Sequence, residues 1–102
     1  MFTYKYIVLK AAKLVLAGAM KFPEIKNITN NQTLSVKLKV GLFVIIDATN
    51  SGIYVFAYTG GTRPSLADTL TEPDYNKYQG GEYFYIENHT GNNVEFHVYS
   101  FA

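Results

Sequence analysis

The stretch from Leu42 to Tyr58 constrains the fold of this chain more than any other part of the sequence. Two runs rich in β-branched and aromatic residues, Leu42 to Asp47 and Ile53 to Tyr58, flank a polar loop, Ala48 to Gly52, that ends in glycine. Strand-forming runs on either side of a short polar loop are typical of an antiparallel hairpin. We therefore predict a hairpin at the centre of the fold.

The first run of this hairpin is apolar on both faces. Leu42, Val44 and Ile46 point to one side of the strand, and Phe43 and Ile45 point to the other. Both faces of the hairpin consequently need cover. We expect a second sheet of the same chain to cover one face, and the N-terminal segment, another subunit or a partner to cover the other.

Size and composition exclude several classes of protein. A chain of 102 residues is large enough for one hydrophobic core and too small for two. It has no cysteine, which removes disulfides, thiolate catalysis and cysteine-based zinc sites. Its net charge of +1 does not favour a nucleic-acid partner.

Residues 1–23 have an apolar character that fits more than one structure. The run from Ile7 to Leu16 is apolar but is interrupted by Lys10 and Lys13, so it is too short for a membrane span and a poor signal peptide. The aromatic and β-branched opening favours strands, whereas the alanine-rich middle fits an amphipathic helix. Pro23 ends either element. We treat residues 1–23 as an N-terminal arm that attaches to a partner or an adjacent subunit, and residues 24–102 as the folded domain.

The next segments predict one short and one regular strand. Glu24 to Gln32 is polar and rich in asparagine, with a short extended piece at Ile25 to Ile28. Thr33 to Val40 then alternates without error, which predicts a one-sided strand whose inward positions are all aliphatic. Those inward positions are Leu34, Val36, Leu38 and Val40. Gly41 separates this strand from the central hairpin and marks a bulge or a bend.

The stretch from Thr59 to Gly81 shows no regular period and predicts a long loop. Loops of this length in small domains are usually functional or disordered. Beyond it, Glu82 to Glu87 and Val94 to Phe101 flank a turn-forming cluster from Asn88 to Asn93, which predicts a second hairpin. Short strands without a convincing long helix predict an all-β fold, an antiparallel β-sandwich that is jelly-roll-like.

Catalytic and metal sites find little support in the sequence. The chain has two histidines and no Gly-x-Ser-x-Gly stretch, so a nucleophilic triad is not predicted. In the predicted second hairpin Glu87 faces Glu95, and His97 lies on the same face, where these side chains could bind a divalent cation. An ordinary solvated sheet face explains the same residues, so we expect no metal, no cofactor and no enzymatic activity.

The long loop carries the best candidate for a binding site. Flat aromatic rings next to planar hydrogen-bonding groups are the residue types of a carbohydrate site. The loop supplies them as Arg63, Asp74, Tyr75, Asn76 and Tyr78. The alternative is that the two tyrosines only fix the loop onto the sheets or onto a neighbour.

In its general composition this chain is similar to the small virion-decoration and fibre proteins of phages. Those proteins are short, free of cysteine, rich in tyrosine and asparagine, and dominated by β-structure. The resemblance is one of composition and implies a non-enzymatic structural or interaction protein, associated with a virion and attached to a larger assembly such as a phage particle. The two-sided hairpin adds the expectation of a closed homo-oligomer, a trimer ahead of a dimer. The alternative function is a carbohydrate-binding, lectin-like module. Neither reading involves nucleic acid or a membrane.

Overall fold

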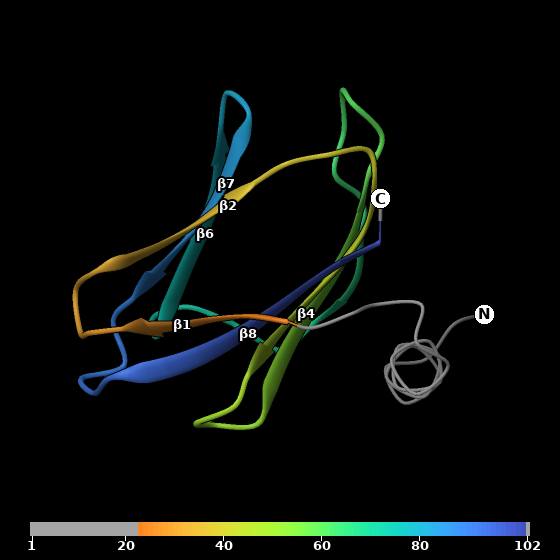
Figure 1. The fold of residues 1–102 in the computed structure, drawn as a ribbon. Helices are drawn as coiled ribbons and strands as arrows, with labels where there is room; N and C mark the ends of the chain where they lie inside the picture. Colours follow the sequence, from red (N-terminus) through yellow and green to blue (C-terminus); the bar gives the residue numbers. More distant parts are fainter. Residues whose placement is uncertain (1–22, 102) are drawn as a thin grey trace.

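The computed structural model describes residues 23–101, which form eight strands and no helix (Figure 1). The strands are β1 (Glu24–Ile28), β2 (Thr33–Lys37), β3 (Gly41–Asp47), β4 (Gly52–Tyr58), β5 (Ser65–Asp68), β6 (Tyr75–Gly80), β7 (Tyr83–Asn88) and β8 (Val94–Phe101). Five of them form one sheet in the order β1-β8-β3-β4-β5, and three form a second sheet in the order β2-β7-β6. All pairings are antiparallel. The all-β prediction is confirmed, and two antiparallel sheets are compatible with a β-sandwich.

The central hairpin is present as predicted. β3 and β4 pair from Gly41 with Tyr58 to Asp47 with Gly52. β3 is also paired along its other edge with β8, so it lies in the middle of the five-stranded sheet. Phe43 and Ile45 belong to the main core, and Val44 belongs to a separate cluster on the opposite face. The prediction that β3 is apolar on both faces is thereby confirmed.

The main core fills the space between the two sheets. Strand alternation turns one side chain in two from each sheet toward the other sheet. The three-stranded sheet contributes Leu34, Val36, Phe84, Ile86 and Tyr75, and the five-stranded sheet contributes Phe43, Ile45, Tyr54, Phe56, Val94, Phe96 and Val98. Phe56, Phe84 and Phe96 are fully buried, and the ring of Phe84 lies 5.2 Å from that of Phe56 across the two sheets.

The prediction of a one-sided strand from Thr33 to Val40 is confirmed over most of its length. Leu34, Val36 and Leu38 are buried as expected, but Val40 is 65 % exposed. The regular strand ends at Lys37, and Gly41 has a φ of 143°. The chain leaves the three-stranded sheet here to enter the other one, so the alternation of the sequence no longer describes which way a side chain points.

The prediction of a long loop from residue 59 to 81 is wrong. β5 and β6 lie inside this stretch, and each forms the edge of a sheet. β5 has only four residues and its pairing with β4 shifts between Val55 and Phe56. β6 carries mostly polar residues because one of its faces is in water. Neither strand has the run of β-branched residues that marks a strand in sequence.

The predicted second hairpin is also wrong, because β7 and β8 are both strands but belong to different sheets. The segment between them turns a corner that is held by the buried Asn88. The side-chain amide of Asn88 donates to the carbonyls of Ile28 and Asn92 at 2.9 and 2.8 Å, and its Oδ1 accepts from Thr90. A turn-forming cluster of this length serves a hairpin and a corner between sheets equally well.

Residues 23–101 contain no helix that is long and apolar enough to span a membrane. The predicted N-terminal arm falls outside the described residues, apart from Pro23.

Candidate functional site

The structure separates the five residues that the sequence groups into one binding site. Asp74 and Tyr75 line a pocket at one end of the two sheets, and Asn76 and Tyr78 lie on the solvent face of the three-stranded sheet. Arg63 lies between the sheets. The separation follows from β6 being a strand: Tyr75 and Lys77 point inward, whereas Asn76 and Tyr78 point to solvent.

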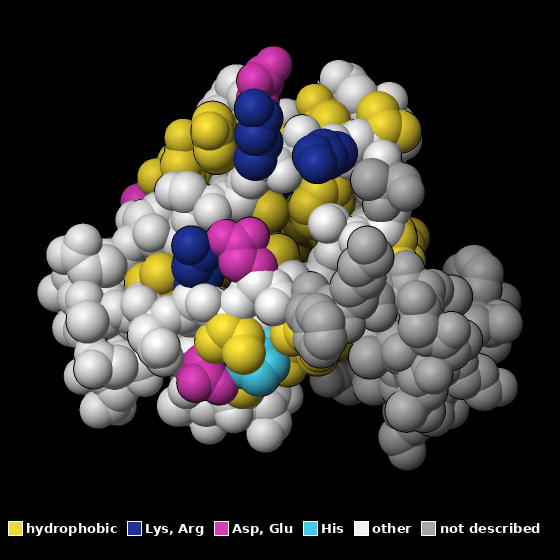
Figure 2. Space-filling view, in the orientation of Figure 1, with side chains coloured by type: hydrophobic (Ala, Val, Ile, Leu, Met, Phe, Trp, Pro, Cys, Tyr) yellow, Lys and Arg dark blue, Asp and Glu magenta, His cyan; other side chains and the backbone are white. Residues whose placement is uncertain are grey.

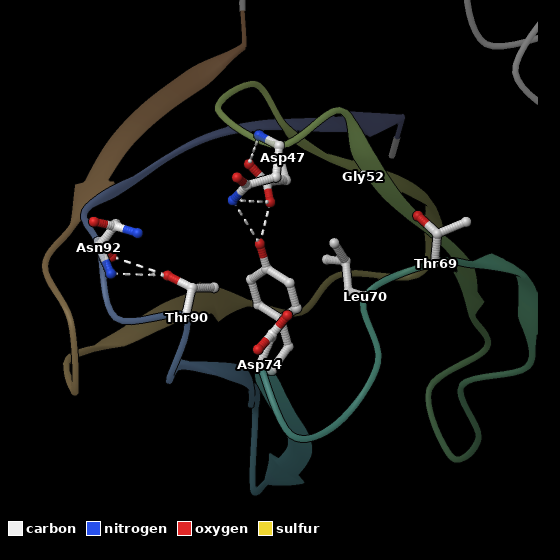
Figure 3. Close-up of a pocket in the computed structure, with 9 residues that line it drawn as sticks. Asp47, Gly52, Thr69, Leu70, Asp74, Thr90 and Asn92 are labelled. Carbon is white, nitrogen blue, oxygen red and sulfur yellow. Dashed lines mark hydrogen bonds between the residues drawn. The ribbon is translucent and has the colours of Figure 1, made fainter.

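The pocket has a volume of about 320 Å³ and is built where five segments meet (Figure 3). Its lining comes from the end of β3 and the turn after it, the start of β4, the segment after β5, the start of β6, and the corner between β7 and β8. These residues are Asp47, Asn50, Gly52, Thr69, Leu70, Asp74, Tyr75, Thr90 and Asn92. In Figure 3, Thr90 and Asn92 lie on one side of the pocket, and Leu70 and Thr69 lie on the other.

A buried carboxylate organises the back of the pocket. Asp47 is fully buried and accepts four hydrogen bonds. Its Oδ1 accepts from the backbone amides of Thr49 and Asn50 at 3.0 and 2.8 Å, which fixes the turn between β3 and β4. Its Oδ2 accepts from Asn50 Nδ2 at 3.1 Å and from the hydroxyl of Tyr75. Asp47 is therefore a structural group whose hydrogen-bonding capacity is already used.

Tyr75 is held in its neutral form by this arrangement. Burial first, and then the hydrogen bond to Asp47, together raise the pKa of Tyr75 to about 12. The hydroxyl also accepts from Asn50 Nδ2 at 3.2 Å. Tyr75 is 6 % exposed, and its hydroxyl is bonded to both Asp47 and Asn50, so within the pocket it supports the lining. A direct binding role of Tyr75 stays a prediction.

The front of the pocket holds polar groups that are free to bind a ligand. Among residues 23–101 the Asp74 carboxylate and the Asn92 side-chain amide make no hydrogen bonds, and both side chains are exposed. Leu70 lies behind them and is only 1 % exposed, so the lining that a ligand would meet is mostly polar. Hydroxyl, amide and carboxylate groups suit a ligand rich in hydroxyls.

A second candidate surface lies on the solvent side of the three-stranded sheet. The register places Tyr85 opposite Ser35 on one neighbouring strand and opposite Tyr78 on the other. Tyr83, two residues from Tyr85 on β7, projects from the same face. We call the surface formed by Tyr78, Tyr83 and Tyr85 the tyrosine face.

Tyr85 is the central ring of the tyrosine face and neighbours both of the other rings. The centroids of Tyr78 and Tyr85 are 5.1 Å apart, and those of Tyr83 and Tyr85 are 6.2 Å apart. Tyr78 and Tyr83 are each 40 % exposed. Gly80 leaves room for this arrangement, because a Cβ at that position would lie 3.2 Å from the ring of Tyr85. In Figure 2, apolar side chains gather along the edge of the molecule formed by this sheet.

One end of the tyrosine face carries a small polar network. Glu87 Oε1 accepts from Asn76 Nδ2 at 3.2 Å and lies 2.8 Å from His89 Nε2. These contacts, first that with His89, lower the pKa of Glu87. Partial burial and the nearby negative charge of Glu87 raise the pKa of Tyr78. The rings therefore lie beside a fixed acidic group and a planar amide.

Arg63 has a structural position rather than a place in the predicted binding site. Its guanidinium lies 4.2 Å from the ring centroid of Phe84 and donates to the hydroxyl of Tyr54. Within the described part of the chain Arg63 has no acidic partner, and its Nε is buried without a hydrogen bond. The charge is thus stabilised mainly by aromatic faces.

The cation site considered on the sheet surface does not form. Glu87 is opposite Thr33 and Asn76, whereas Glu95 is opposite Asn27 in the other sheet. Glu95 is instead bonded to His97 at 2.7 Å. Residues 23–101 contain no group of three or more acidic, histidine or cysteine side chains that could hold a metal ion.

Sequence reasoning missed most of the residues that make up these two surfaces. Tyr83 and Tyr85 could have been found, since the alternation of β7 places them on the face opposite Phe84 and Ile86. The pocket residues from other segments carry no such signal, because only the tertiary structure brings Asn50, Thr69, Thr90 and Asn92 together.

None of the protein-family models, curated proteins and solved structures compared with this chain matches it.

Proposed function

We propose that this chain is a non-enzymatic interaction protein, attached to a larger assembly such as a phage or virus particle, and that the tyrosine face is its contact surface. Tyrosine combines a large apolar ring with a polar tip and is enriched in protein interfaces. The observation that carries the proposal is a row of three tyrosine rings on one sheet face, with Tyr85 between two rings that are each 40 % exposed.

The position of the tyrosine face in its sheet adds support. β2 and β6 are both edges of the three-stranded sheet, so the unpaired backbone groups of two strands border the rings. A partner can then combine ring contacts with backbone hydrogen bonds. A closed homo-oligomer, a trimer ahead of a dimer, is part of the proposal, and the tyrosine face gives it an interface.

Light scattering coupled to size exclusion tests this assembly. We expect the wild-type protein to have a mass that is a multiple of 11.5 kDa, with three chains ahead of two. The double variant Tyr78→Ser and Tyr83→Ser should elute as a folded monomer, because both rings project from the surface of the single chain and are not part of its core.

Ile25→Ser is the matched control. Ile25 is 54 % exposed on the edge strand of the other sheet, so its replacement removes an exposed apolar side chain from a different surface. The control should keep the wild-type mass. A wild-type mass near 11.5 kDa, or an unchanged mass in the double variant, contradicts assembly through the tyrosine face.

Binding of carbohydrate is the second candidate function, and the pocket favours it. The free Asp74 carboxylate and Asn92 amide lie next to Leu70 in a space of about 320 Å³, which is at the lower end of the size of small-molecule sites. Asp74→Asn should abolish binding of any glycan that an array identifies, without changing stability. Glu82→Gln, an exposed carboxylate in the turn between β6 and β7, should leave binding unchanged.

We also propose that the fold is jelly-roll-like. The support is the position of the last strand between the first and the third, with β7 beside β2 in the second sheet. In Greek-key connections a strand from late in the chain likewise pairs with strands from early in the chain. β4 departs from it, since it stays beside β3 as a simple hairpin.

A further inference from the structure

The side of the five-stranded sheet that faces away from the three-stranded sheet, called here the outer face, is strongly apolar. Its cluster consists of Val44, Ile53, Val55 and Ala67, with Leu42, Ile46, Tyr99 and Phe101 packed against it. The register joins these residues across four strands: Val44 is opposite Val55 and Tyr99, and Val55 is opposite Ala67.

The centre of the outer face is buried. Val44 is 2 % exposed and Val55 is 1 % exposed. Every strand among residues 23–101 belongs to one of the two sheets, so no described strand lies over this face (Figure 1). Leu42, Ile46, Tyr99 and Phe101 of the same face pack around this centre. Val44 and Val55 are thus almost completely buried although no described strand covers them.

We propose that residues 1–22 of the same chain pack on the outer face and cover it. The start of β1 lies close to the outer cluster, since Glu24 is paired with Val98, which is next to Tyr99 of that cluster. Pro23, the first described residue, precedes Glu24 and therefore lies near the edge of the cluster.

Residues 1–22 are long enough to cross the outer cluster from β8 to β5. The distance from β8 to β5 is three strand spacings, roughly 14 Å. Twenty-two residues reach roughly 33 Å even as a continuous helix, which has the smallest rise per residue. Residues 1–22 can therefore cross the cluster in either of the conformations that the sequence allows.

The chemistry of the segment also fits. Ile7 to Leu16 is apolar except for Lys10 and Lys13, and the outer face is apolar with Glu95 at its margin, bonded to His97. Apolar residues can cover the cluster while the lysines stay in water near the carboxylate. This inference is independent of the tyrosine face, which lies on the other sheet.

Cysteine accessibility tests the proposal in the full chain, which has no cysteine of its own. Ala67→Cys places a thiol in the outer cluster, and Ala48→Cys places one in the exposed turn between β3 and β4. With a small maleimide, Cys at position 67 should react at least about tenfold more slowly than Cys at position 48, since a covered site reacts only when it opens locally. Equal rates in the folded protein overturn the proposal.

A second measurement identifies what covers the face. Ala67→Cys is combined in turn with Leu9→Cys, Leu14→Cys and Leu16→Cys, and each pair is oxidised. We expect at least one pair to give a disulfide within a single chain, seen as a monomer on a non-reducing gel. Disulfides only between chains, or none in any pair, overturn the proposal; the former assigns the cover to a second copy of the protein.

Discussion

The hydroxyl of Tyr75, at the start of β6, donates to the buried carboxylate of Asp47, at the end of β3. The two residues belong to different sheets, so this hydrogen bond ties the sheets together at the end that holds the pocket. A hydrogen bond to a charged and desolvated acceptor contributes more to stability than one between neutral groups. Loss of the hydroxyl should consequently lower the free energy of unfolding of the whole domain.

Tyr75→Phe removes this bond and keeps the ring. We expect a loss of about 1.5 to 3 kcal/mol in the free energy of unfolding, because the carboxylate stays buried with one donor fewer. Urea denaturation at neutral pH measures the change. Tyr78→Phe, on the exposed face of the same strand, is the control and should stay within about 0.5 kcal/mol of wild type. Equal losses in the two variants would show that the bond to Asp47 contributes no more to the free energy of unfolding than an exposed tyrosine hydroxyl does.

The same residue predicts a dependence on alkaline pH. The pKa of Tyr75 is raised from 10.0 to about 12 in the folded protein, first by burial and then by Asp47. Below pH 10 the hydroxyl is protonated in both the folded and the unfolded chain, so its full contribution is present. Between pH 10 and 12 only the unfolded chain releases the proton, which favours unfolding. The stability difference between wild type and Tyr75→Phe should therefore shrink over this range. A constant difference would contradict the raised pKa.

Gly52 lies where the pocket meets the core. A Cβ at this position would lie 2.6 Å from Cδ2 of Leu70, a residue that is 1 % exposed. Gly52→Ala should therefore cost about 1 to 3 kcal/mol, as overpacking of a filled core does. Gly61→Ala is the matched control, since nothing lies within 4 Å of its Cβ position. Thermal unfolding of both variants distinguishes them, and a Gly52→Ala protein as stable as the control would show that Leu70 repacks freely.

Arg63 allows the contribution of a cation among aromatic rings to be measured. Its guanidinium lies within 4.2 to 5.6 Å of the ring centroids of Phe84, Phe56 and Tyr54. Arg63→Met keeps most of the packing of the side chain and removes the charge, so we expect a loss of about 0.5 to 2 kcal/mol from the cation–π contacts.

Arg63→Ala removes the packing as well and should be the less stable of the two variants. Chemical denaturation of both proteins, compared with wild type, separates the two effects. An Arg63→Met protein as stable as wild type would show that the half-buried charge brings no net stabilisation.

Patterns within a few residues determined a large part of this fold. The β-branched and aromatic runs around Ala48 to Gly52 specified the central hairpin, and its apolar residues on both faces specified a strand that needs cover on two sides. The alternation from Leu34 to Leu38 specified which side of β2 is buried. These features depend on the period of a strand and on side-chain hydrophobicity, both of which are local properties of the sequence.

Only the tertiary structure decided how the strands combine. The segment around Asn88 is compatible with a hairpin, yet Asn88 binds the carbonyl of Ile28, far away in sequence, and the chain turns into the other sheet. The polar stretch that contains β6 becomes a strand because β7 offers it a paired edge, and this pairing sends Tyr75 to the pocket and Tyr78 to the solvent face. The pocket itself joins Asp47, Asp74 and Asn92 from three segments. No local pattern encodes such a meeting, since it depends on contacts between residues that are distant in the chain.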